Sequence, residues 1–572
     1  MLEQRVAAAL IAAGAPAGTP PAVRPAARPG FGDYQANGVM AAAKSLKTDP
    51  RRLAQEVVRH LDLADVASQV EAAGPGFINI TLRDEWLAGA LTAAARDPRL
   101  GVDAVARPQT VVVDYSGPNL AKEMHIGHLR STIIGDAVVR ALEFLGHRVI
   151  RQNHVGDWGT QFGMLIAHMA ELEAPHDRLA AELADLERFY RQAKQRYDTD
   201  PQFAARARRY VVRLQSGDAE CLSLWRAFID ESMRHCEQIY RRLGVTLERE
   251  HAMPESAYND DLPAVVAELA TAGLAVDSDG AMCVFLPEFK GKDGEPLPLI
   301  VQKSDGGYLY ATTDLAAVRY RVCVLRAERV LYLVDARQQL HFRQVFAAAR
   351  AAGWVPAQTR LEHLPFGTMM GPDGKPFRTR TGGTIKLAEL LEEAEQRAFA
   401  LVTEKNAALD EAARTRIARA VGIGAVKYSD LAKNRIGDYV FDWDTMLALD
   451  GNTAPYLQYA YARVRSIFRR ESLAAIAGEA EIRVAEPAER RLALQLIRLE
   501  ETLLAVAADG TPHVLCGYLF ELAGAFMSFY ETCPVLKALP ATRASRLSLC
   551  MLTASTMRLG LDLLGIDVLD QM

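Results

Sequence analysis

The sequence predicts a multidomain α/β protein built around a parallel sheet, with a helical C-terminal part. An apolar run at residues 111–113 indicates a strand, and apolar positions at three- and four-residue intervals then indicate a helix that Gly146 ends. Residues 148–152 indicate a second strand, so the segments form a strand–helix–strand unit whose crossover should be right-handed. From about residue 390 the pattern is helical almost to the end of the sequence.

The first hundred residues predict a compact α+β unit of their own. Helical patterns cover residues 2–13, 31–43 and 50–61, and a Pro/Gly-rich link at 14–30 separates the first two. A turn and an alternating strand follow at residues 74–82. From the residues alone, this unit can contact a partner molecule or serve as a dimerisation or scaffold domain.

A second helix-rich region, residues 170–243, interrupts the α/β pattern before strand-like runs return at 281–286, 299–302 and 330–334. The last run is followed by polar residues that open another helix, so they lie at the carboxyl end of a strand. The helix-rich region carries a cluster of arginines, which is a solvated helix face or, less commonly, an RNA contact. The cluster consists of Arg206, Arg208, Arg209 and Arg213.

Size and charge limit the classes of protein to consider. With 572 residues the chain is too long for one core, and the usual domain size predicts roughly three or four domains. The net charge of -5 excludes a non-specific binder of nucleic acid that depends on bulk positive charge. A specific RNA enzyme can still concentrate positive charge on one face. No apolar run approaches the length of a membrane span, so we expect a cytoplasmic protein without membrane contact.

The seven cysteines predict buried free thiols in a reducing compartment. They are scattered, and no two of them form a C-x-x-C pair. We therefore expect no structural zinc and no other protein-bound metal.

The segment between the first strand and its helix carries the strongest chemical signal. His125 and His128 flank Gly127 at the start of the helix, beyond the carboxyl end of the strand. Ligands of parallel sheets bind at this edge, beside helix N-termini. A nucleotide can lie against the glycine while both imidazoles reach its phosphates. The alternative is a helix N-terminus with two solvated histidines.

The tetrapeptide at residues 125–128 resembles the HIGH signature of class I aminoacyl-tRNA synthetases, and residues 116–132 resemble arginyl-tRNA synthetases specifically. The resemblance covers the whole chain. It implies a class I Rossmann-like catalytic domain at 106–445, with a helical insertion at about 170–243 and stem helices from about 390. It also implies an additional N-terminal domain at 1–105, which in the family contacts the outer corner of tRNA, and a DALR-type helical anticodon-binding domain at 446–572.

Residues 367–384 are glycine-rich and basic, and occupy the place of the second class I signature, KMSKS. By this resemblance Lys375 stands for the first lysine and Thr379 for the serine, while Arg378 replaces the second lysine. In the family, a lysine just before HIGH is thought to compensate for a missing second lysine in KMSKS, and Lys122 is at that place. Such cations stabilise the charge that develops as pyrophosphate leaves. Read alone, the segment is equally a basic hairpin turn. The expected ATP contacts are Gly127, Met370 and Thr379.

Arginine as substrate requires a carboxylate, because its guanidinium pairs bidentately with Asp or Glu. Tyr310 and Asp314 are one helical turn apart and should face the same way. By resemblance they form the guanidinium pocket together with Glu255. The amine and carboxylate of arginine would be held by Ser116, Asn119 and Gln338.

Residues 153–163 resemble a family motif that lines the floor of the site. We expect the segment to shape the pocket, with His154 and Asp157 as further candidate substrate contacts. A structural role for His154 is an equal alternative.

A helix is predicted to start near Pro455, with an apolar stripe made of Leu457, Ala460, Tyr461, Val464, Ile467 and Phe468. Its other side interleaves aromatic residues with arginine, which suits stacking on unpaired RNA bases. That side carries Tyr456, Tyr459, Arg463 and Arg470, and by resemblance Tyr530 and Met572 also lie near the anticodon loop. A plain helix-packing face is the alternative.

The resemblance implies that arginine and ATP give arginyl-adenylate and pyrophosphate, and that arginine is then transferred to the 3′ end of arginine tRNA. Mg²⁺ would assist ATP. Family members generally need tRNA for the activation of arginine. A monomer is expected. Two alternatives are a nucleotidyltransferase that uses the same helix without tRNA and a non-catalytic tRNA-binding paralogue. The Tyr/Arg face argues against the first, and the complete set of His125, His128, Lys122 and Asp314 argues against the second.

Overall fold

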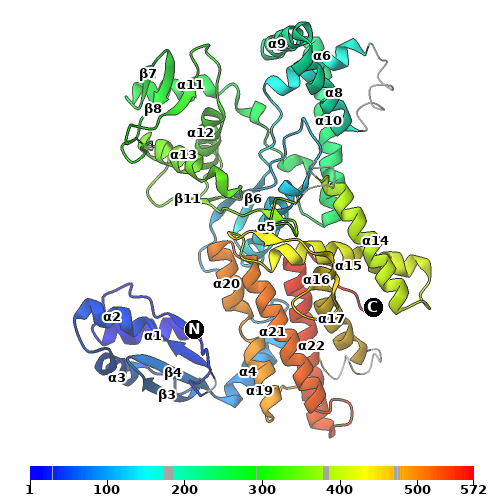
Figure 1. Ribbon diagram of the computed structural model, residues 1–572. Coiled ribbons are helices and arrows are strands. Elements are labelled where there is room, and N and C mark those ends of the chain that lie inside the picture. Colours follow the sequence, from blue (N-terminus) through cyan, green and yellow to red (C-terminus); the bar gives the residue numbers. More distant parts are fainter. Residues whose placement is uncertain are drawn as a thin grey trace.

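The computed structural model describes residues 1–28, 30–172, 185–291, 293–377, 385–468, 473, 477 and 480–572. The parallel sheet lies at the centre of the molecule, with two lobes above it and a helical bundle below (Figure 1). The N-terminal domain lies beside the lower part of that bundle (Figure 1).

The N-terminal domain is a four-stranded antiparallel sheet, in the order β1-β2-β4-β3, with three helices packed against it. The predicted helices are present as α1 (Leu2–Ala12), α2 (Gly38–Leu46) and α3 (Pro50–His60), and the predicted strand as β4 (Phe77–Leu82). The strands β1 (Val23–Pro25), β2 (Tyr34–Ala36) and β3 (Ala67–Ala73) complete the sheet.

The prediction of helix from residue 31 was wrong, because Tyr34–Ala36 is strand β2 and pairs with β4. Gly32 has a φ of +77°, and a Cβ there would lie 2.7 Å from the Ile80 carbonyl oxygen. Because the two backbones approach so closely here, the residues after Gly32 adopt an extended conformation and pair with the sheet, and the helix begins only at Gly38. The expected link at 14–30 also contains the short strand β1.

The central sheet has four parallel strands in the order β11-β10-β5-β6. The predicted unit is present as β5 (Thr110–Asp114), α5 (Ile126–Phe144) and β6 (Arg148–Gln152). The strands β10 (Arg329–Tyr332) and β11 (Arg360–His363) extend the sheet on the other side of β5. Asp114 and Tyr332 are register partners, so the segments that follow β5 and β10 leave the sheet at the same edge.

The strand-like runs at 281–286 and 299–302 lie outside the parallel sheet. They are β8 (Ala281–Val284) and β9 (Leu299–Gln302), which form a separate antiparallel sheet with β7 (Ala275–Ser278). The helices of this lobe are α11 (Leu262–Thr271), α12 (Tyr310–Arg319) and α13 (Gln339–Ala351) (Figure 1).

The other upper lobe is the predicted helical insertion. Its helices are α6 (Thr160–Glu171), α8 (Leu186–Thr199), α9 (Pro201–Gln215) and α10 (Ala219–Leu243). Within the arginine cluster, Arg206 pairs with Glu171 at 2.6 Å and Arg213 pairs with Asp218 at 3.0 Å. These pairs favour the interpretation of a solvated helix face.

In the described residues after β11, helices predominate, and a short strand β12 (Met369–Met370) pairs with β13 (Tyr439–Val440). The stem helices are α14 (Leu387–Lys405), α15 (Glu411–Leu431) and α16 (Trp443–Leu447), and the lower bundle comprises α17 (Ala454–Ile467), α19 (Pro487–Leu496), α20 (Leu499–Asp509), α21 (Pro512–Thr532) and α22 (Pro540–Leu563). The helix α4 (Asp84–Arg96) lies between the N-terminal antiparallel sheet and the parallel sheet in the chain. None of the helices in the described ranges is both long and apolar enough to cross a membrane.

All seven cysteines are free thiols. Six are buried as predicted, but Cys323 is exposed, so the prediction was wrong there. Cys323 lies in a short π-helical segment, Tyr320–Val324, which continues α12.

Candidate active site

The two signature histidines cap the N-terminus of α5. The Gly127 N–H donates to His125 Nδ1 at 3.0 Å, and the His125 N–H donates to His128 Nδ1 at 3.1 Å. Because both Nδ1 atoms accept hydrogen bonds, the ring proton of each neutral imidazole is on Nε2. The capping arrangement therefore makes both histidines hydrogen-bond donors through Nε2.

The same two rings lie close together and are partly buried, with centroids 4.1 Å apart. Burial, aided by the charge of His125, lowers the pKa of His128 to about 3. Burial, aided by the charge of Lys122, also lowers the pKa of His125. Gly127 is exposed, and a Cβ there would lie 2.7 Å from His125 Cε1. A glycine at this position therefore keeps both rings in place and leaves space for a ligand.

The helix that presents these histidines is anchored to the stem. Arg130 Nε lies 3.1 Å from Asp430 Oδ2 on α15, and both side chains are buried. Arg130 Nη1 also donates to the Gly437 carbonyl at 3.0 Å. The partners are about 300 residues apart in the sequence, so no local pattern predicts this contact.

Glu255, Asp157 and Asp314 form a group of neighbouring carboxyl groups. Glu255 begins a 3₁₀ turn, Glu255–Tyr258, and its N–H donates to the Val155 carbonyl at 3.0 Å. Burial, together with the charges of Asp157 and then Asp314, raises the pKa of Glu255 to about 8. Asp157 accepts hydrogen bonds from Ser256 N at 2.9 Å and Ser256 Oγ at 2.5 Å. Three carboxylates thus converge, which favours a cationic ligand.

Asp314 lies on α12 and contacts His341 on α13, with 2.6 Å between Asp314 Oδ2 and His341 Nε2. Tyr310 is at the start of α12, 66% exposed, and burial together with the charge of Glu255 raises its pKa. Gln338 is exposed just before α13. We did not identify His341 from the sequence, although it belongs to the polar run that follows β10.

Ser116 and Asn119 lie in the loop between β5 and α5. Ser116 is buried with a φ of +73°, and its hydroxyl lies 2.8 Å from the Tyr240 hydroxyl. Asn119 is half-buried, and its Oδ1 accepts from the Ala121 N–H at 3.0 Å. Tyr240, on α10, also accepts from Asn153 Nδ2 at 2.9 Å, so the insertion fixes this loop. Sequence reasoning missed Tyr240.

His154, in the segment predicted to shape the pocket, packs against a neighbouring tyrosine. Its ring centroid is 5.7 Å from that of Tyr258. Its Nδ1 is buried and has no hydrogen-bond partner in the part of the chain that the structure describes. A ligand in the site could therefore supply a partner for His154.

The predicted phosphate-binding segment, 367–384, begins just before β12 and includes Met370, the last residue of that strand. A turn follows, in which the Gly371 N–H donates to the Lys375 carbonyl at 2.7 Å and Gly374 has a φ of +69°. Lys375 is exposed at this turn. Arg378 and Thr379 lie outside the described residues. Lys122 is exposed beside α5, with its ammonium 4.4 Å from the centre of the Tyr190 ring.

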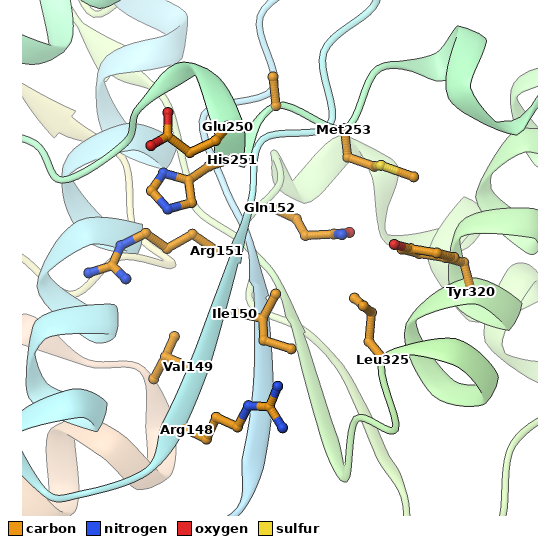
Figure 2. A pocket seen from close by; sticks show the side chains of 11 residues that line it. Arg148, Val149, Ile150, Arg151, Gln152, Glu250, His251, Met253, Tyr320 and Leu325 are labelled. Atoms are coloured by element: carbon orange, nitrogen blue, oxygen red, sulfur yellow. The ribbon is translucent and has the colours of Figure 1, made fainter.

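A hollow of about 450 Å³ follows the free edge of β6 (Figure 2). Gln152 and Tyr320 face each other across it, while Arg151 points to the other side of the strand (Figure 2). None of the predicted site residues lines this hollow, so it is distinct from the candidate active site.

Comparison with known proteins identifies the family. The catalytic domain of class I tRNA synthetases of the arginine type matches residues 91–443, the arginyl-tRNA synthetase N-terminal domain matches 1–82, and the DALR anticodon-binding domain matches 457–572. The chain belongs to the arginyl-tRNA synthetase family. Membership confirms the predicted fold class and the predicted activity, that of an arginine–tRNA ligase.

Similar members cover the whole chain. The arginine–tRNA ligase of Hahella chejuensis is 61% identical over 100% of this chain and 99% of its own length. The arginyl-tRNA synthetase structure from Plasmodium falciparum has a TM-score of 0.85 and 28% identity, covering 100% of this chain and 98% of that one. The Thermus thermophilus arginyl-tRNA synthetase has a TM-score of 0.81 and 27% identity, covering 100% and 99%.

In this arginyl-tRNA synthetase family member the DALR match includes most of α17. The predicted apolar stripe of α17 is buried, as expected. On the other side Tyr459 is 44% exposed, and the Arg463 guanidinium lies 5.3 Å from the centre of the Tyr530 ring. Tyr456 is half-buried beside Phe520, and Met572 packs near α14 and α15. Arg470 lies outside the described residues.

Proposed function

We propose that the carboxyl edge of the parallel sheet activates arginine with ATP and that the helical C-terminal domain contacts the anticodon of arginine tRNA. The proximity of Glu255 to Asp314 and Asp157 carries the proposal, because carboxyl groups gathered in this way suit a guanidinium, whose charge would hold Glu255 ionised. We further propose that residues 1–105 contact the outer corner of tRNA and that residues 106–445 and 446–572 form the other two domains. The enzyme would act as a cytoplasmic monomer.

The guanidinium of arginine would pair with Asp314 and Glu255, with Tyr310 covering it at the entrance. Asn119 and Gln338 would hold the amine and carboxylate of arginine. Ser116 has the same proposed role, although its hydroxyl already lies against Tyr240. This arrangement would direct the arginine carboxylate toward the histidines of α5.

ATP would lie against Gly127 and Met370, with phosphate oxygens accepting hydrogen bonds from Nε2 of His125 and His128. In the first step a carboxylate oxygen of arginine attacks the α-phosphorus, and the bond from that phosphorus to pyrophosphate breaks. The negative charge that grows on the leaving group would be met by Lys122, Lys375, Arg378 and Thr379. Mg²⁺ would accompany ATP on its phosphate oxygens.

In the second step a hydroxyl of the tRNA 3′ ribose attacks the carbonyl carbon of arginyl-adenylate, and AMP leaves. Positioning the two reactants accounts for most of the rate enhancement that this chemistry needs. The anticodon contacts would come from exposed and half-buried side chains of the C-terminal domain, namely Tyr456, Tyr459, Arg463, Tyr530 and Met572.

Aminoacylation with each of the twenty amino acids tests the proposal. We expect charging of arginine tRNA with arginine alone, and pyrophosphate exchange that depends on arginine. Exchange measured with and without tRNA separates this activity from that of a tRNA-independent nucleotidyltransferase. Charging with a different amino acid, or exchange without any response to arginine, would overturn the assignment of the carboxylate pocket.

A further inference from the structure

Lys122 is held by the helical insertion rather than by a carboxylate. Its ammonium lies 4.4 Å from the centre of the Tyr190 ring, on α8. In the described part of the chain no Asp or Glu oxygen lies within ion-pair distance of Lys122. Three acidic side chains nevertheless belong to the same neighbourhood, namely Glu123, Asp185 and Glu187.

A second lysine, Lys386, pairs with two of those acidic side chains. Lys386 Nζ lies 3.1 Å from Glu123 Oε1 and 3.4 Å from Asp185 Oδ1. Asp185 also caps α8, because its Oδ1 accepts from the Arg188 N–H at 3.0 Å. The start of α8 is therefore tied to the residue next to Lys122, and this fixes the Tyr190 ring relative to the Lys122 side chain.

Whether an aromatic ring or a carboxylate holds Lys122 determines how much of its positive charge remains available to a phosphate. A carboxylate would neutralise the Lys122 ammonium and compete with a phosphate for it. An aromatic face attracts the ammonium through its quadrupole but carries no net charge. A lysine held in this way is oriented yet keeps its full charge for an incoming anion.

We propose that Tyr190 is a positioning residue that holds Lys122 ready for the pyrophosphate leaving group. This inference rests on the role proposed above for Lys122. It assigns the helical insertion a part in the activation step, through one aromatic side chain. The Lys386 cluster keeps the nearby carboxylates away from Lys122.

The test is ATP–pyrophosphate exchange in the presence of tRNA, with kcat and the KM for arginine measured separately. Tyr190→Leu should lower kcat about fivefold, since loss of a cation–π contact at an exposed lysine is of that order, with the KM for arginine within about twofold. Tyr190→Phe keeps the ring and should retain kcat within about twofold. Lys122→Ala should lower kcat at least as much as Tyr190→Leu.

The matched control is Tyr197→Leu. Tyr197 lies on the same helix, with its ring centre 5.8 Å from the Lys194 ammonium, and has no contact with Lys122. This variant should keep the parental kcat. Circular dichroism and the thermal midpoint should match between the two Leu variants, which separates positioning from folding.

The double variant Lys122→Ala/Tyr190→Leu decides whether the two residues act together. We expect its kcat to equal that of Lys122→Ala, because Tyr190 acts through Lys122. A further loss in the double variant, or a parental kcat in Tyr190→Leu beside an impaired Lys122→Ala, would overturn the inference alone. A parental kcat in Lys122→Ala would instead overturn the proposed role of Lys122, and the inference with it.

Discussion

His341 Nε2 lies 2.6 Å from Asp314 Oδ2, and this contact joins the first turn of α13 to α12. A carboxylate accepts hydrogen bonds, so the imidazole is the donor. The contact orients Asp314 and leaves its Oδ1, among the residues that the structure describes, without a protein donor. One oxygen of Asp314 is therefore held by the protein, and the other can meet the guanidinium of arginine.

Asp314→Asn should raise the KM for arginine and leave the KM for ATP almost unchanged. Loss of one charge of a buried hydrogen-bonded pair costs about 3 kcal/mol, which is on the order of a hundredfold. Citrulline lacks the guanidinium charge, so the parent should reject it and the variant should discriminate less. Pyrophosphate exchange with both amino acids measures this.

His341 tests whether the orientation of Asp314 matters, because it contacts Asp314 but has no proposed contact with arginine. His341→Leu should raise the KM for arginine several-fold, whereas His341→Gln keeps a donor and should lie closer to the parent. If Glu255→Gln is impaired while Asp314→Asn is not, Glu255 is the principal carboxylate. If neither change matters, arginine does not bind in this pocket.

The parts of the site that follow local sequence could be predicted. The strand–helix–strand unit and the capping histidines depend on residues within a few positions of one another, so periodicity and spacing are sufficient. His341 and Tyr240 depend on the packing of distant helices onto the site, and no single-sequence pattern encodes such contacts. The pKa of Glu255 depends on burial, which only the folded chain supplies.

In the fold, too, local sequence predicts some elements, whereas others depend on contacts between distant parts of the chain. Residues 34–36 were assigned to a helix because their local pattern allowed one, but pairing with β4 overrides that preference. Strand β3, with the sequence Ala-Ser-Gln-Val-Glu-Ala-Ala, has few strand-forming residues and is stabilised by its antiparallel pairing with β4.

Arginine binding should depend on pH through Glu255. Its pKa of about 8 means that the carboxyl group of the free enzyme is protonated below that value, whereas a guanidinium requires the carboxylate. The KM for arginine should therefore fall as pH rises toward 8, by at most about tenfold per unit, and level off above it. Glu255→Gln should remove this dependence. A parental KM that is constant from pH 6 to 8.5 would contradict the assignment.

The histidines of α5 should act on the transition state as neutral donors. His125→Ala or His128→Ala should lower kcat for arginine activation at least about tenfold, with a modest change in the KM for arginine. Because the pKa of His128 is lowered to about 3, its titration should not appear in the pH dependence of kcat between pH 6 and 8. Near-parental kcat in both variants would refute this role.

The exposed face of α17 should bind RNA. Tyr459→Ala and Arg463→Ala should raise the KM for tRNA and leave the KM for arginine nearly unchanged. In Arg463→Ala the salt dependence of tRNA binding should weaken by a slope of about one, since one phosphate contact is lost.

A matched control for this face is Arg465→Ala, because the Arg465 guanidinium pairs with Asp570 at 3.2 Å. That variant should keep the parental salt slope. If Tyr459→Ala and Arg463→Ala both bind tRNA like the parent at every salt concentration, this face of α17 does not contact RNA.

The attachment of the N-terminal domain should matter for tRNA and not for arginine. Arg490 on α19 donates through Nη1 and Nη2 to the two oxygens of Asp33, at 2.8 Å each, and through Nε to Asp84 at 2.7 Å. Asp33 is 7% exposed, so removal of its partner leaves a nearly buried charge unpaired, at a cost of about 3 kcal/mol or more. Arg490→Leu should therefore loosen the domain, raise the KM for tRNA and preserve the KM for arginine. Arg490→Lys keeps the positive charge but loses the planar two-donor geometry of the guanidinium, so its KM for tRNA should lie between those of the parent and Arg490→Leu.

The exposed neighbour Arg491 provides the control, since Arg491→Leu should behave like the parent. Limited proteolysis between the N-terminal and catalytic domains, measured beside the two KM values, should be faster only in the Arg490 variants. An unchanged KM for tRNA in Arg490→Leu, despite faster cleavage, would show that the N-terminal domain does not help to bind tRNA.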